Sequence, residues 1–367
     1  MSAPAAPQEP AVQKVSPLEL FFDLIFVFAV TQVTSLVTHP HELAEYAKAV
    51  LVFFTLMWMY DGFAWLTSNV LVRSDWDYSL LAVAMASFMV MSLAIPTVFG
   101  AGGLVYGVGL VVVILVHAVM FRTAPNSSSK AILDVVPYNL GMAGLVIGAT
   151  FVPQDLRLPM WAATVALAVV ATLLRREGRF ELSPVHFVER HGLLVIVALG
   201  ESIVGIGEGA RDLPLTLPLL GYVVLGLYFG VCLWATYFDE DAEKAEHAMV
   251  HASPKRRNRM ALLGFGYAHY AMIAGIMLAA AGLEVGVRHP LEIAPIWSTW
   301  NLAAGLALYL AGDIAYRRTM SIGPNRFRFM TAILALATGL LGTYFCATIH
   351  LLACCLLGTA LWVLDES

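Results

Sequence analysis

The stretch SPLELFFDLIFVFAV (residues 16–30) places Glu19 and Asp23 at the mouth of an otherwise apolar run. Ser16, Pro17 and Glu19 occupy the N-cap, N1 and N3 positions of a capping box, which predicts that a helix begins here. The apolar run that follows is long enough to cross a bilayer, since a spanning helix needs about 20 residues. The stretch therefore predicts a membrane helix with two acids near its start.

The composition of the whole chain is that of a polytopic membrane protein. Hydrophobic residues make up 59% of the 367 positions, charged residues make up 13%, and the mean hydropathy is +0.77. A soluble domain has roughly 45–50% apolar and about 25% charged residues. We predict an all-α polytopic membrane protein with about 12 transmembrane helices, near residues 17–38, 46–69, 78–98, 102–121, 131–152, 157–174, 187–207, 215–238, 259–283, 293–316, 327–343 and 345–363.

The number of spans at the C-terminal end depends on how one apolar run is divided. The last two predicted helices belong to one unbroken apolar run, which as a single helix would overshoot the bilayer. We divide this run at Gly342 and Thr343. A total of eleven spans is the alternative.

The basic residues divide unequally between the two sides of a twelve-helix bundle. Of the 21 Lys and Arg residues, 17 fall on the side of the N-terminus, and the other four are Lys48, Arg157, Arg211 and Arg288. Cytoplasmic loops carry an excess of Lys and Arg. The distribution therefore predicts that both termini are cytoplasmic.

Two segments on this side lie outside the predicted spans. Residues 1–15 are rich in Ala and Pro and lack the pattern of a cleaved signal, so we expect a disordered N-terminal tail. Residues 239–258 begin acidic and end basic. Here we expect a cytoplasmic loop that opens with a short surface helix, stabilised by an i,i+4 pair of Glu240 and Lys244.

The start of the first span is repeated at mid-chain. The stretch SPVHFVERHGLLVIVALGESIV, which begins at Ser183, resembles the opening stretch and predicts two parallel six-helix repeats, residues 16–175 and 176–364. Alignment of the two Ser-Pro pairs gives an offset of 167 residues, whereas alignment of Glu19 with Glu189 gives an offset of 170. The sequence leaves both registers open.

Polar residues inside the spans are the candidate functional residues, because an ionisable side chain within the bilayer usually faces a partner or a water-filled cavity. Glu201 lies deep in its span, and Gly200 and Gly205 beside it allow another backbone to approach closely. We predict a permeation or coupling path lined by Asp23, Thr31, Asp61, Glu201 and Asp313. The alternative for Asp23 and Glu201 is that each is a buried acid satisfied by neighbouring helices.

Charged residues also gather at the predicted cytoplasmic ends of the first and seventh spans. We expect ion pairing there among Glu19, Glu189, Arg190 and His191. Glu19 also has a structural explanation as the N3 residue of the capping box. No metal-ligand spacing, phosphate-binding loop or nucleophile pattern occurs in the sequence. We therefore expect no metal, no cofactor, no nucleic-acid partner and no enzymatic activity.

Two motifs resemble a known family. ELFFDLIFVF (residues 19–28) and ERHGLLVIVALGES (residues 189–202) are similar to the recurrent signatures of the bacterial low temperature requirement A (LtrA) family. The resemblance extends from about residue 15 to residue 364. It implies a multi-pass protein of the bacterial inner membrane and carries no established biochemical activity with it.

A second and weaker resemblance concerns the same first helix. FFDLIFVFAVT (residues 21–31) is similar to the first-helix motif of potassium channels that are built from two six-helix repeats. Phe22 stands where that family has serine, and Gly192-Leu193 stands where its second repeat has the aspartate. What this resemblance implies is the architecture of two six-helix halves with an acid on the first helix.

These observations favour a transporter or channel for a small cation, a proton or a proton-coupled solute, with its path between the two halves. The lipid bilayer and the transported species are the expected partners, and a homodimer is one option for the assembly. A non-transporting sensor or structural protein that supports growth in the cold is the main alternative. A membrane-embedded enzyme is the weaker one, and it would use His186 and the charged residues that follow it.

Overall fold

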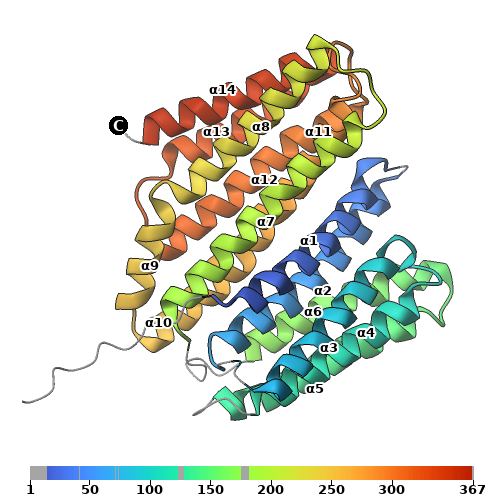
Figure 1. Ribbon diagram of the computed structural model, residues 1–367, viewed down its shortest axis with the longest axis vertical. Helices are drawn as coiled ribbons and strands as arrows, with labels where there is room; N and C mark the ends of the chain where they lie inside the picture. The colour runs from blue at the N-terminus through green and yellow to red at the C-terminus, as the bar shows by residue number, and fades with distance from the viewer. Residues whose placement is uncertain are drawn as a thin grey trace, which may run out of the picture.

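The computed structural model describes residues 15–365 except 41, 71, 73, 123–127 and 175–181, so residues 1–14 of the predicted tail lie outside it. The first half of the chain forms six long helices (Figure 1). They are α1 (Pro17–Thr38), α2 (Leu43–Thr67), α3 (Asp75–Ala94) with a 3-10 turn η1 (Ile95–Thr97), α4 (Gly103–Phe121), α5 (Ser128–Ala149) and α6 (Gln154–Leu174).

The second half also consists of helices and contains an additional surface segment. Its elements are α7 (Pro184–Ala210), α8 (Leu217–Phe238), α9 (Asp241–His251), α10 (Pro254–Met260), the π-helix η2 (Ala261–Ala268), α11 (His269–Gly286), α12 (Ile296–Met320), α13 (Arg326–Tyr344) and α14 (Ala347–Asp365). The start of α1 and the end of α14 lie at the end of the bundle that carries α9, which we call the α9 end (Figure 1).

The predicted fold class is confirmed. Among the described residues there is no strand, and eleven helical stretches are long and apolar enough to cross a membrane. The helix α12 is as long as these but more polar, because it carries Asp313, Arg317 and Arg318. The protein is therefore an all-helical, multi-pass membrane protein.

Two predicted boundaries were wrong. The last apolar run breaks at Phe345 and Cys346, not at Gly342-Thr343. Gly342 lies inside α13, where an added Cβ would come within 2.5 Å of His350 and Thr299, so this glycine serves close helix packing and not a turn. The ninth predicted span, 259–283, is in fact one continuous helical stretch from Pro254 to Gly286.

The segment between α8 and this long stretch contains the short surface helix that the sequence predicts. An ion pair of Glu240 and Lys244 lies at the start of α9. The guanidinium group of Arg257 donates to the carbonyl oxygens of Met249, Val250 and Ala252 at 2.9–3.1 Å, which satisfies the end of α9. Part of the basic cluster therefore folds the loop back onto itself.

The helices pack in the same order in each half. In the first half, α1 packs against α2 and α3, and the helices from α3 to α6 are successive neighbours. In the second half, α7 packs against α8 and α11, and the helices from α11 to α14 are successive neighbours. The two halves meet where α1 packs against α7 and α11 (Figure 1). This contact holds most of the polar residues that the sequence singles out.

Candidate functional site

Polar side chains, most of them buried, follow the contact between the two halves over most of the length of α7. We call this set the polar seam. It consists of Glu19, Asp23, Thr31, Thr34 and Thr38 on α1, His186, Arg190 and Glu201 on α7, and Glu284 on α11.

At the α9 end of the seam, Glu19 starts its own helix and also contacts α7. The Ser16 hydroxyl accepts the N–H of Glu19, and the Glu19 carboxylate accepts the N–H of Ser16 at 2.8 Å, so the predicted capping box is present. The second carboxylate oxygen of Glu19 lies 3.1 Å from Nε2 of His186. Nδ1 of His186 lies 3.1 Å from the Ser68 hydroxyl of α2. The cap thus also joins α1 and α2 to α7.

One turn deeper, Asp23 and Arg190 form an ion pair that is shielded from solvent. Oδ1 of Asp23 lies 3.0 Å from the Arg190 guanidinium group and accepts the Tyr60 hydroxyl at 2.9 Å. Arg190 also lies over the Tyr60 ring, 5.5 Å from its centroid. Both charged side chains are only 1% exposed. Glu189, the other acid expected at this mouth, is not in the seam; its carboxylate accepts the N–H of Val15 near the surface.

His191, which follows Arg190 on α7, pairs with Asp61 of α2. Nε2 of His191 lies 3.5 Å from Oδ1 of Asp61, and its Nδ1 lies 2.8 Å from the carbonyl oxygen of Phe187. The His191 ring packs edge-on against His269 of α11, which contacts the hydroxyl of Tyr237 at 3.0 Å. Asp61 therefore stands between the two halves, beside the seam.

Toward the far end of the bundle, the acids of the seam face threonines and not bases. Oε2 of Glu201 lies 2.6 Å from the Thr31 hydroxyl, and Thr34 is a second hydroxyl partner. Oε2 of Glu284 lies 3.4 Å from the Thr38 hydroxyl. These three threonines lie on one face of α1, and Thr31 is one of the residues that the sequence places on the predicted path.

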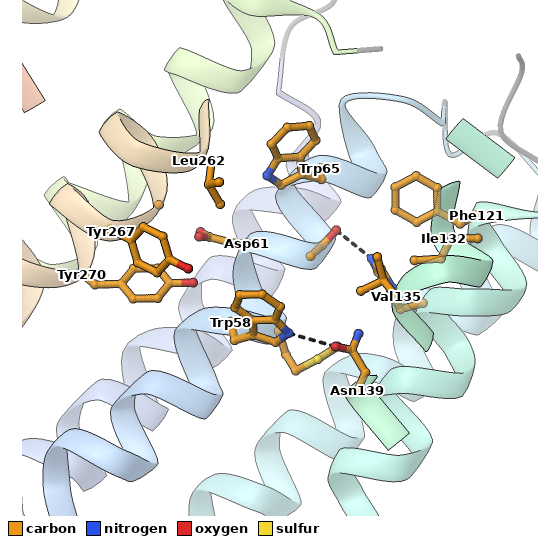
Figure 2. A pocket seen from close by; sticks show the side chains of 14 residues that line it. Trp58, Asp61, Trp65, Phe121, Ile132, Val135, Asn139, Leu262, Tyr267 and Tyr270 are labelled. Carbon is orange, nitrogen blue, oxygen red and sulfur yellow. Dashed lines mark hydrogen bonds between the residues drawn. The ribbon is translucent and has the colours of Figure 1, made fainter. Parts of the chain in front are cut away.

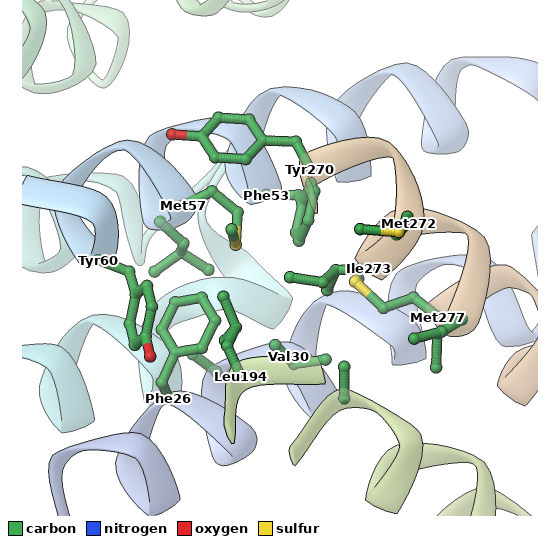
Figure 3. Close-up of a cluster of buried hydrophobic side chains, with 14 of the residues drawn as sticks. Phe26, Val30, Phe53, Met57, Tyr60, Leu194, Tyr270, Met272, Ile273 and Met277 are labelled. Carbon is green, nitrogen blue, oxygen red and sulfur yellow. The ribbon is translucent and has the colours of Figure 1, made fainter. Parts of the chain in front are cut away.

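An apolar layer separates the two polar ends of the seam (Figure 3). We call it the apolar seal. It consists of Phe26 and Val30 on α1, Met57 on α2, Leu194 on α7 and Ile273 on α11, all of them buried. The Phe26 ring lies 4.4 Å from the Tyr60 ring, so the seal packs directly on the Asp23–Arg190 pair. Arg190 and Glu201 are about 16 Å apart along α7, a separation that this layer fills.

Several contacts across the seam join residues that are 167 positions apart in the sequence. With an offset of 167 residues, Glu19 corresponds to His186, Asp23 to Arg190, and Thr34 to Glu201, and the members of each pair contact each other. The helices α1 and α7 also start at corresponding prolines, Pro17 and Pro184.

Asp313 does not lie in the polar seam. It lies inside the second half, where its carboxylate accepts a hydrogen bond from Arg328 of α13. Arg328 also lies 3.1 Å from Asp241 and 2.8 Å from Asp365, and Arg317 contacts these same two acids. This network ties α9, α12, α13 and the end of α14 together at the α9 end.

Sequence reasoning brought together some of these residues and missed others. It singled out Asp23, Asp61, Arg190 and His191 and expected ion pairing for the two basic residues, but it did not assign an acid to each. Two important partners were not predicted: Arg328 was counted only as a topology signal, and Glu284 lies one residue beyond a predicted span. Their position within or at the edge of an apolar run is the signal that could have found them.

Comparison with known proteins places the chain in a family. A family model described as "Bacterial low temperature requirement A protein (LtrA)" matches residues 14–363. The chain belongs to the LtrA family. An uncharacterized protein of Rhizobium meliloti (strain 1021) is 26% identical over 332 residues, which cover 84% of this chain and 78% of that protein. The weaker resemblance to two-repeat potassium channels finds no support in these matches.

Proposed function

We propose that this LtrA-family protein moves a small cation, a proton or a proton-coupled solute across the membrane, along the contact between its two halves. The observation that carries the proposal is the polar seam itself: α1 and α7 pair acids with bases or hydroxyls on both sides of an apolar seal. Buried ionisable groups in a bilayer mark pathways and proton relays more often than they mark simple packing. Apolar constrictions close such pathways by excluding water.

The hydrogen-bond pattern around Glu201 supports a proton as one of the moving species. The hydroxyls of Thr31 and Thr34 are each directed at a carbonyl oxygen of their own helix, on Val27 and Val30, at 3.2 and 3.1 Å. A hydroxyl has a single hydrogen to donate. If Thr31 donates to Val27, the hydrogen in its 2.6 Å contact with Glu201 comes from a protonated carboxyl group. Glu201 then has a proton to release when its surroundings change.

The charge distribution supports an orientation. Lys48 and Arg157 lie together at the far end of the bundle, where both contact Phe99. Arg211 and Arg288 lie at the same end, where each contacts Glu208. With the other basic residues on the opposite side, we infer that the α9 end faces the cytoplasm and that the protein resides in the inner membrane.

Replacement of Glu201 tests the proposal. We expect wild-type protein in proteoliposomes to dissipate at least one imposed gradient of protons, sodium or potassium, and Glu201→Gln to lose about tenfold or more of that flux, because the amide cannot exchange a proton. Glu208→Gln is the matched control, since Glu208 lies two turns further along α7 and is exposed. Flux in Glu201→Gln equal to that of Glu208→Gln would refute a role for the seam. No flux with any gradient would favour the non-transporting sensor.

A further inference from the structure

A second polar feature lies between the two halves, beside the polar seam. It is a small, partly open recess with about 60 Å³ of space, lined by α2, α4 and α5 of the first half and by the η2–α11 segment of the second (Figure 2). Neither Asp23 nor Glu201 contributes to its wall.

The wall of the pocket combines one carboxylate with several aromatic rings. The side chain of Asp61 is 13% exposed, its Oδ1 lies 3.5 Å from Nε2 of His191, and Tyr270 is a hydrogen-bond partner of its carboxylate. Figure 2 shows Asp61 beside Tyr267 and Tyr270, with Trp58 below it and Trp65 above. Aromatic faces attract a positive charge, and a carboxylate adds a full negative charge beside them.

The π-helix η2 shapes the side of the pocket that belongs to the second half. It supplies Leu262, Gly266 and Tyr267 to the wall. An added Cβ at Gly266 would lie 3.4 Å from Oδ2 of Asp61, so the backbone of η2 approaches this carboxylate closely. Stretches of π-helix are rare and frequently occur at functional sites.

The contact between Asp61 and His191 requires a proton. Nδ1 of His191 faces the carbonyl oxygen of Phe187, so it must donate, and Nε2 of a neutral ring would then present a lone pair to Oδ1 of Asp61. One proton on either group removes this repulsion, and a cation in the pocket would compete with that proton. The other titratable groups that face the pair, or line the pocket with it, are Asp23, Tyr60, His117, Arg190, His269 and Tyr270.

We propose that this pocket binds an organic cation, an amine or quaternary ammonium group on an apolar body, with Asp61 as its counter-charge and Trp58, Trp65, Tyr267 and Tyr270 around it. The inference deepens the proposed function, on which it rests, by naming the class of cargo.

The test measures binding to the full-length protein in detergent, without any flux. The probe is benzyltrimethylammonium, and the comparison compound is neopentylbenzene, in which carbon replaces the nitrogen and removes only the charge. Isothermal titration and tryptophan fluorescence report the affinity. We expect the cation to bind about tenfold or more tightly than its neutral isostere. Equal binding of the two compounds to wild-type protein would overturn the proposal, whatever any variant does.

Variants then locate the site. Asp61→Asn should weaken binding of the cation by about tenfold or more, whereas Asp155→Asn, at an exposed acid of α6, should leave it unchanged. Equal affinity in wild type and Asp61→Asn would overturn the assignment. Binding is measured at equilibrium, so it can be detected even if the flux assay shows no transport. If the cation does not bind, the proposed transport of inorganic cations or protons is not affected.

Discussion

Arg190→Met should lower the free energy of unfolding by about 3–5 kcal/mol, because it leaves the carboxylate of Asp23 buried without its counter-charge. Asp23 would keep only the hydroxyl of Tyr60 as a partner. The cation–π contact between Arg190 and the Tyr60 ring would be lost as well. The measurement is the midpoint and slope of denaturant unfolding of the purified protein in detergent.

Two further variants separate this effect from a general loss of arginine. Arg211→Met removes an exposed guanidinium group at the end of the same helix and should change stability by less than about 0.5 kcal/mol. The double variant Asp23→Asn with Arg190→Met removes both charges and should recover most of the loss. If Arg190→Met is as stable as Arg211→Met, the pair does not hold the halves together.

Arg328→Met should have an effect of similar or larger size, at least about 3–5 kcal/mol, in the second half of the molecule. Arg328 contacts three acids, and Asp313 among them is completely buried. Asp241 and Asp365 would keep Arg317 as a partner. Asp313 would lose the arginine that donates a hydrogen bond to it. Denaturant unfolding in detergent measures the loss.

The matched control for this variant lies on α12. Arg318→Met removes an exposed arginine and should be close to neutral. Since the network also holds the end of α14 to α9, Arg328→Met should in addition make the C-terminal segment more sensitive to added protease. Unchanged stability together with unchanged proteolysis would show that the network is not needed for the fold.

The sequence predicts the helices well and their partners poorly. Each apolar run has the length of a span, and Ser16, Pro17 and Glu19 mark the start of α1 by chemistry that acts within one turn. Such local signals do not depend on the rest of the chain. The misplaced break at Gly342 has the opposite cause, because that glycine is explained only by Thr299 and His350 of other helices.

The candidate site shows the same limit. Depth in the bilayer identifies Asp23 and Glu201 as unusual, but the choice of Arg190 for one and Thr31 for the other depends on the register between α1 and α7. That register follows from the packing of whole helices, and the sequence was compatible with two different registers. Arg328 was misjudged for a related reason: a basic residue near a helix end satisfies the positive-inside rule whether it faces water or a buried acid.

The most direct test of the proposed path concerns the apolar seal. Leu194→Ser places a hydroxyl in the seal, whereas Ile196→Ser makes the same change two residues away on the same helix, where the side chain is 47% exposed. In proteoliposomes, we expect Leu194→Ser to increase the flux of protons or small cations above the wild-type rate, and Ile196→Ser to leave that rate unchanged. If both variants conduct like wild type while remaining folded, the path does not run between the two halves.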